Sequence, residues 1–187
     1  MPMLTLDQIL DDLTAVTTEV ETEFGSLADG PFNWKPTPGE WSVAQCLDHL
    51  TLTNRAYFPE FERVIRGEPS ANPWTRAPLL PAFFGWMLKK ALAPDSTMKT
   101  KTFKTIEPST SQLPLSIITD FAAMQQQLAG LMRATASLDG AKIRITSPVI
   151  NRVITYSLQD CRQILASHER LHLNQARRVM ASPGFPG

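Results

Sequence analysis

The chain has 187 residues, of which 43% are hydrophobic and 19% charged, and these values predict one soluble globular domain over residues 1–187. Its 18 basic and 18 acidic side chains cancel, which argues against a nucleic-acid partner because phosphate binding needs a basic surface. Its two cysteines make no disulfide framework, and no stretch reaches the roughly 20 apolar residues of a membrane span. We therefore expect free thiols, no membrane partner, no secretory signal and a cytoplasmic location.

The first predicted helix begins at Thr5, where residues 5–8 have the form of a capping box. Apolar side chains then recur at three- and four-residue steps as far as Phe24, which predicts one buried stripe. Gly25 and the Gly30-Pro31 pair are expected to end this helix. The prolines and the glycine of residues 32–40 predict a loop.

A second helix is predicted to open at Ser42, with Gln45 completing another capping box. Its apolar stripe continues to Ile65, and Gly67 closes it. Pro59 falls inside this pattern, so we expect it to kink the helix or to start a new helical segment.

The long connection over residues 67–114 is predicted to be irregular because prolines recur along its first part. Within it, residues 81–93 suit a short helix and residues 98–104 an extended segment. A connection of this length inside one domain is usually a lid or an interface. It also carries the best candidates for a local basic patch, although a solvated face explains them more simply: Lys99, Lys101 and Lys104.

A third long helix is predicted over residues 114–138, then a small hairpin from residues 142–147 and 151–156. A capping box at Ser157 opens the last helix, which runs to about Met180. Four amphipathic helices without long strands predict an all-α fold, a four-helix bundle of the up-and-down type. The long crossover would allow the second and third helices to run parallel.

The chain has three histidines, and two of them lie four residues apart in the last predicted helix. His168 and His172 differ by about 40° around the helix axis and about 6 Å along it, so both rings can reach one ion. Two imidazoles alone bind a metal weakly. His49 lies on an apolar-periodic helix and is the only histidine left to supply a third ligand, which would give a catalytic type of site with an open position. Hydrogen-bonded core or surface histidines are the competing interpretation.

Residues 168–172 also match the H-E-x-x-H pattern of zinc proteases, in which Glu169 would be the general base. That scheme usually needs a further ligand downstream. After His172 the chain contains no histidine, aspartate or glutamate. The pattern therefore favours a site shared between two helices over a self-contained protease site.

Several short motifs, taken in order, resemble the DinB/YfiT-like superfamily of metalloenzymes over nearly the whole chain. They are Trp34-Lys35-Pro36, Gly39-Glu40-Trp41-Ser42, Asp48-His49-Leu50, Met98-Lys99-Thr100, Phe103-Lys104 and the run from His168 to Arg178. The resemblance implies a four-helix bundle of DinB/YfiT-like topology with a long crossover between helices 2 and 3, and often a homodimer. It implies nickel, zinc or another divalent ion on three histidines, which by position are His49, His168 and His172.

Other side chains close in sequence to these histidines are secondary candidates. Glu169 is a candidate catalytic or outer-shell residue, and Gln175 could line the pocket or hold a water. Gln45 and Thr53 each lie one turn from His49 and are similar candidates. Cys46 and Cys161 are expected to pack in the core.

With three neutral histidines the metal keeps its double charge, so a bound water or thiol would be acidified. The leading hypothesis is therefore a metal-dependent transferase or hydrolase that acts on a small molecule, with a thiol cosubstrate as one option. The resemblance supports it, since members with known activity include thiol-dependent transferases and isomerases. The alternative is a non-catalytic binding or stress-response protein that the metal stabilises. A DNA-binding damage-response protein is disfavoured by the balanced charge.

Overall fold

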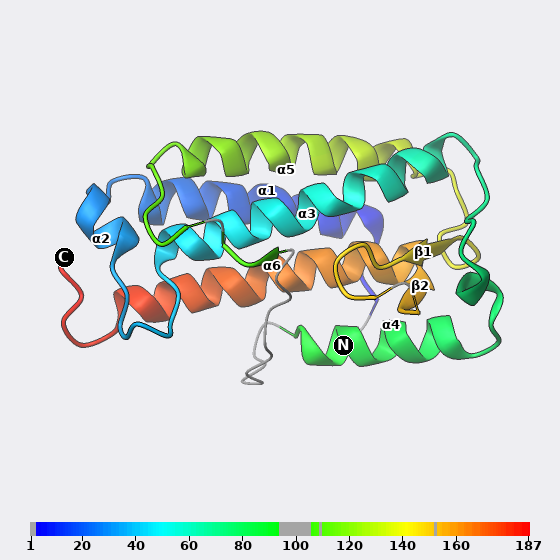
Figure 1. The fold of residues 1–187 in the computed structure, drawn as a ribbon. Helices are drawn as coiled ribbons and strands as arrows, with labels where there is room; N and C mark the ends of the chain where they lie inside the picture. Colours follow the sequence, from blue (N-terminus) through cyan, green and yellow to red (C-terminus); the bar gives the residue numbers. More distant parts are fainter. Residues whose placement is uncertain (1–2, 94–105, 109, 152) are drawn as a thin grey trace.

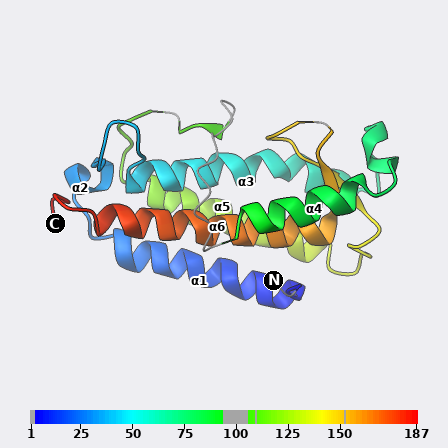
Figure 2. The ribbon, with the colours of Figure 1, turned by 90° about the horizontal axis from the view of Figure 1, so that it is seen from below.

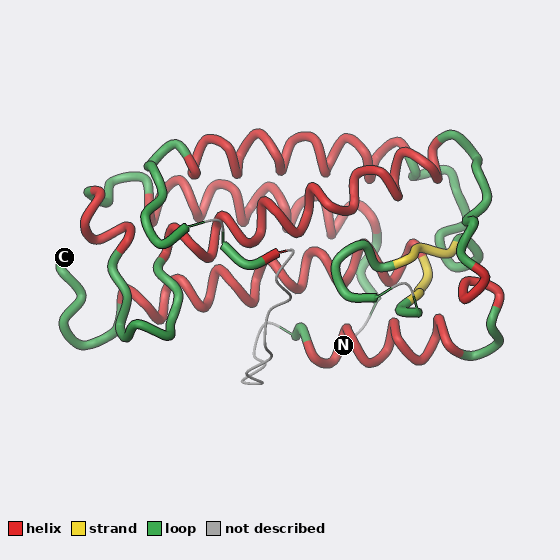
Figure 3. The backbone as a smooth tube through the Cα atoms, in the orientation of Figure 1, coloured by secondary structure: helices red, strands yellow, loops and turns green. Residues whose placement is uncertain are grey.

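A computed structural model describes residues 3–93, 106–108, 110–151 and 153–187, and it is predominantly helical (Figures 1 and 3). The described part of the chain is all-α apart from one two-stranded sheet. The elements in chain order are α1 (Leu6–Phe24), α2 (Asp29–Asn33), α3 (Val43–Ile65), the 3-10 helix η1 (Pro73–Arg76), α4 (Leu80–Ala91), α5 (Ile117–Ala134), β1 (Arg144–Thr146), β2 (Thr155–Ser157) and α6 (Leu158–Met180).

Four long helices, α1, α3, α5 and α6, lie side by side along one direction (Figures 1 and 2). α3 packs against α5 and α6, and α1 packs against the same two helices. α3 and α5 run in the same direction, as the long connection between them allows (Figure 1). This arrangement places α3 beside α6, the two helices on which all three histidines lie.

The two strands and α4 cover the N-terminal part of α6, whereas α2 packs against α3 at the other end of the bundle (Figure 1). β1 and β2 form an antiparallel pair in which Ile145 opposes Tyr156, and α4 packs against both β2 and α6. The hairpin expected from the sequence is therefore present, with strands of three residues each. None of the described helices combines the length and the apolar character that a bilayer crossing requires.

The predicted helix starts are confirmed by their hydrogen bonds. Thr5 Oγ1 accepts from the backbone N–H of Gln8, and the side chain of Gln8 accepts from Thr5 N–H. Ser42 and Gln45 exchange the same pair of bonds. At Ser157 only half of the box is formed: its hydroxyl accepts from Asp160 N–H and donates to the Asp160 carboxylate. These caps fix where α1, α3 and α6 begin.

The prediction of a loop after Gly30-Pro31 was wrong at its start, because residues 29–33 form the short helix α2. Pro31 lies in the first turn of α2, where its missing N–H costs no helical hydrogen bond. Of the two outcomes expected at Pro59, a kink or a new helical segment, the second is excluded, because α3 is a single element through Pro59. Buried Tyr57 and Phe61 on either side hold that stretch against the core.

α5 is shorter at both ends than the predicted 114–138. It stops at Ala134 because side chains take over the hydrogen bonding there. Thr135 donates its hydroxyl to Met132 O, and Arg162 donates to Thr135 O. The expected extended segment over residues 98–104, with the basic-patch lysines in it, lies outside the described residues.

An ion-pair network on the outer face joins α6 to α1. Arg170 donates to Asp12 (2.8 Å) and Glu19 (2.7 Å), and Arg177 donates to Glu19 (2.6 Å) and Glu23 (2.8 Å). Glu19 therefore bridges both arginines. Because Arg170 and Arg177 lie on the helix of the two clustered histidines, the network helps to set the rotation of α6 about its axis.

Glu19→Gln should lower the free energy of unfolding by about 1 kcal/mol near neutral pH, since the network has lost its central charge. Partial burial raises the pKa of Glu19, but hydrogen bonds from Arg170 and Arg177 outweigh this and hold it below its ordinary value of 4.5. The stabilisation is therefore complete above that value and is lost as pH falls through the folded-state pKa. Urea unfolding of both proteins between pH 3 and 7 checks this; a difference that does not shrink at low pH contradicts it.

Candidate metal centre

The three histidines meet between α3 and α6. His49 lies in the second turn of α3 and is 2% exposed, and His168, in the middle of α6, is 7% exposed. His172 follows one turn later and is partly exposed. One ring nitrogen from each side chain lies within 4.8 Å of the other two. Side chains as far apart in the sequence as His49 and His172 therefore form one cluster.

The spacing of these nitrogens suits a single ion. His49 Nε2 and His168 Nε2 are 3.2 Å apart. Two nitrogens that each lie 2.0–2.1 Å from a tetrahedral zinc are about 3.3 Å from one another. The ring centroids of the three histidines are 4.5–5.1 Å apart, with interplanar angles of 63–83°. The rings converge edge to face, with none stacked flat on another.

Hydrogen bonds on the outer side of two rings set which nitrogen faces inward. His49 Nδ1 is 2.6 Å from the carbonyl oxygen of Ile106, and His172 Nδ1 is 2.9 Å from Gln175 Oε1. Since both acceptors are oxygens without a hydrogen, each Nδ1 must carry the proton and each Nε2 keeps its lone pair. A metal-ligating histidine typically has such an outer partner, which fixes its tautomer and ring orientation.

His168 differs from the other two because its Nδ1 is buried and has no hydrogen-bond partner among the described residues. Its ring is held instead by the backbone of α6 and by the neighbouring rings. Hydrogen bonds thus orient two of the three imidazoles, whereas the position of the His168 ring depends on the placement of α6.

All three imidazoles are neutral at pH 7. Burial is the largest cause in each case: it lowers the pKa of His49, lowers that of His168 well below 6.5 with the help of the other two histidines, and lowers that of His172 to about 3. Neutral rings offer lone pairs without a prior loss of protons, which is the form that binds a divalent cation.

Trp41 covers one side of the cluster. Its ring centroid lies 4.8 Å from that of His49 and 5.6 Å from that of His172, and the indole is nearly parallel to the His172 ring. This contact was not predicted from the sequence. Its signal was weak, because Trp41 precedes the N-cap of α3 and is two turns from His49.

Of the other candidates named from the sequence, Gln175 touches a histidine through its bond to His172. Gln45 serves the start of α3, where its Oε1 accepts from Ser42 N–H and its Nε2 donates to Thr110 O. Thr53 is buried, and its hydroxyl has no partner in the described part of the chain. A role for Gln45 or Thr53 at the site stays a prediction.

Glu169 is completely buried, and its carboxyl group is held by two amides from other helices. Asn54 Nδ2 on α3 donates to Oε1 (2.7 Å), and Gln125 Nε2 on α5 donates to Oε2 (2.6 Å). The side chain thus links α6 to α3 and α5. Its catalytic role stays a prediction, because the two hydrogen bonds that it accepts come from amides and not from a histidine.

Cys46 and Cys161 are 0% exposed, as expected of core residues. Burial raises the pKa of the Cys46 thiol to about 12.

Burial raises the pKa of Glu169 to about 8, although the bonds from Gln125 and Asn54 oppose this. Between pH 4.5 and 8 the folded protein thus holds a proton that the unfolded chain has lost, so stability falls as pH rises through this window. Glu169→Gln removes the titrating proton and keeps two hydrogen-bonding atoms. We expect this variant to gain stability relative to the wild type from pH 5 to pH 8, measured by thermal unfolding with chelator present.

Glu169→Leu is the matched control, because it leaves the amides of Asn54 and Gln125 buried without their acceptor. It should be destabilised at every pH, by about 1–3 kcal/mol for each unpaired donor. Parallel stability profiles of the wild type and Glu169→Gln would contradict a neutral buried acid.

Comparison with protein-family models gives a match to the DinB superfamily over residues 12–176. The matched segment includes His49, His168 and His172. Comparisons with curated proteins and with solved structures gave no match.

Proposed function

Because the chain belongs to the DinB superfamily and its three histidines are positioned to bind a metal, we propose that it is a metal-dependent enzyme acting on a small molecule. Zn²⁺ or Ni²⁺ would be held by the Nε2 atoms of His49, His168 and His172. The convergence of three neutral imidazole nitrogens from two helices carries this proposal. The fold alone would not, since one fold supports many functions.

Three neutral protein ligands leave a divalent ion with its full charge and an open position, which acidifies a water or a thiol bound there. The residues of this chain supply the rest. Ile106 O and Gln175 hold two rings in the ligating tautomer, and Trp41 shields one side of the cluster from water. This arrangement favours a transferase that uses a thiol cosubstrate, or a hydrolase.

A non-catalytic role is the alternative, in which the metal only joins α3 to α6 and stabilises the bundle. This alternative is supported by the burial of His49 and His168, since His172 is the most exposed of the three ligands. The homodimer stays a prediction from the resemblance, and the cytoplasmic location stays a prediction from the cysteine content and the N-terminal sequence.

Metal content tests the ligand set. The purified protein should bind about one equivalent of Zn²⁺ or Ni²⁺ per chain, measured by elemental analysis after dialysis. His49→Asn should retain almost none, because two ligands on one helix bind weakly. Gln175→Ala removes only the partner of His172, so its affinity should fall by about 10–100-fold.

Cys46→Ser is the control, since its buried side chain is close to His49 in sequence but outside the proposed ligand set. It should keep the full equivalent. Equal metal content in the wild type and His49→Asn would exclude the three-histidine site.

Activity separates the enzyme from the metal-stabilised protein. The metal-loaded wild type should transfer a small thiol to an electrophilic test substrate, or hydrolyse an activated ester or amide, and both chelation and His49→Asn should abolish the reaction. If metal removal lowers the melting temperature while neither activity is found across such a panel, the non-catalytic role is supported instead.

A further inference from the structure

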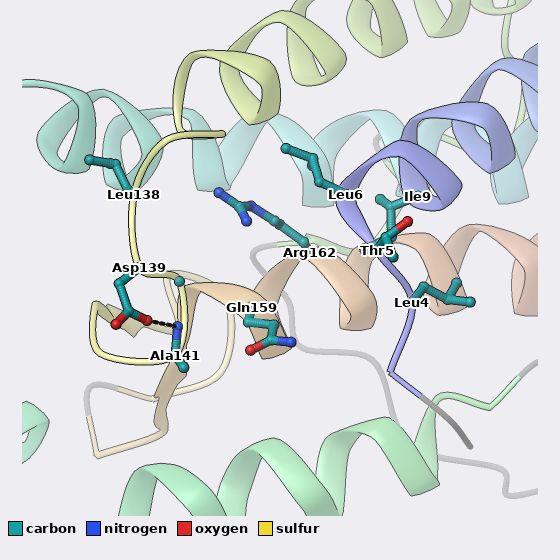
Figure 4. A pocket seen from close by; sticks show the side chains of 10 residues that line it. Leu4, Thr5, Leu6, Ile9, Leu138, Asp139, Ala141, Gln159 and Arg162 are labelled. Carbon is teal, nitrogen blue, oxygen red and sulfur yellow. Dashed lines mark hydrogen bonds between the residues drawn. The ribbon is translucent and has the colours of Figure 1, made fainter.

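A hollow lies beside the N-terminal part of α6, away from His172. A cavity of about 280 Å³ is bounded by the start of α1, the loop after α5 and the first turns of α6 (Figure 4). The side chain of Arg162 lies between Leu138 and Leu6 in this view. Arg162 precedes His168 by six residues, about 9 Å along the helix and about 120° around it, so the cavity does not belong to the metal centre.

Arg162 is only 7% exposed, yet much of its guanidinium is unused. Nη2 donates to the carbonyl oxygen of Thr135 (2.8 Å) and to its hydroxyl (2.6 Å). Nε has no acceptor among the described residues, and no bond within that part of the chain involves Nη1. A buried arginine with unpaired N–H groups can donate hydrogen bonds to a ligand that is not part of the chain.

Among the residues that the structure describes, no carboxylate forms an ion pair with Arg162. The acidic residue on the cavity rim is Asp139, whose two oxygens are taken by Lys142 Nζ (3.0 Å) and Ala141 N–H (3.2 Å). The C-terminal end of α5 at Thr135 offsets part of the charge, whereas the N-terminal ends of α1 and α6 add positive potential. The cavity is therefore electrostatically suited to an anion.

The walls of the cavity restrict the kind of anion. Leu6, Ile9 and Leu138 line part of it, beside the polar side chains of Thr5, Asp139 and Gln159, so a ligand with an apolar part and a polar part suits it. One guanidinium with Asp139 on the rim suits one negative charge better than the two of a phosphate. We propose that this cavity binds a small monocarboxylate, whose carboxylate accepts from Nη1 of Arg162 and whose short aliphatic tail lies against Leu6, Ile9 and Leu138.

Two substitutions change the cavity in different ways. Arg162→Met removes the donor together with the bonds to Thr135. Gly140→Ala keeps Arg162 itself and adds a methyl group 3.3 Å from its Nη1 and 3.4 Å from the backbone nitrogen of Gln159, in space that the carboxylate needs. Arg133→Met removes an exposed arginine from the last turn of α5 and serves as the charge-matched control.

The probe is butyrate, titrated into the full-length protein at constant ionic strength and followed by the backbone amide signals of Leu6 and Ala141 in ¹H–¹⁵N NMR spectra. Saturable shifts are expected in the wild type and in Arg133→Met. The dissociation constant should rise by at least about tenfold in Arg162→Met and in Gly140→Ala. Should Arg162→Met fail to fold by circular dichroism, Gly140→Ala decides the result alone.

n-Butanol and inorganic phosphate are titrated in parallel. An equal response to n-butanol would overturn the proposal in favour of a merely apolar hollow, and tighter binding of phosphate would overturn the assignment to monocarboxylates. Butyrate binding that is unchanged in folded Gly140→Ala would place the site elsewhere. Absence of any saturable shift would leave Arg162 as the cap of α5 and nothing more.

Discussion

The structure depends first on the packing of α3 along α6. Neither helix holds a metal site alone, because α6 offers two imidazoles and α3 offers one. Their contact brings His49 Nε2 to 3.2 Å from His168 Nε2. The cluster also constrains the helices in return: a relative shift of one turn, about 5.4 Å, would separate the nitrogens beyond the reach of a shared ion.

Interactions on the other faces of α6 maintain this alignment. Glu169 is bound by amides from α3 and α5, and Arg170 is bound by Asp12 and Glu19 on α1. The residues that directly follow His168 thus engage the three other long helices. This arrangement compensates for the absence of an outer hydrogen bond to His168 Nδ1 in the described residues, since the position of that ring is set by its backbone.

The main helices could be predicted because apolar spacing and capping boxes are local signals, and the pairing of His168 with His172 follows from helical geometry. His49 could be predicted as the third ligand because it is the one other histidine in the sequence and because of the family resemblance. The contacts that complete the site could not be predicted. The acceptor for His49 is the backbone carbonyl of Ile106, which no side-chain pattern marks, and the partner of Glu169 on α5, Gln125, lies 44 positions away. Such contacts depend on tertiary packing.

The most direct test of the account is a crystal structure of the protein loaded with Zn²⁺ or Ni²⁺, with data collected at the absorption edge of the metal. The account predicts one anomalous peak between α3 and α6, about 2.0–2.1 Å from the Nε2 atoms of His49, His168 and His172. A peak bound to other residues, coordination through Nδ1, or no peak between the three rings would contradict it.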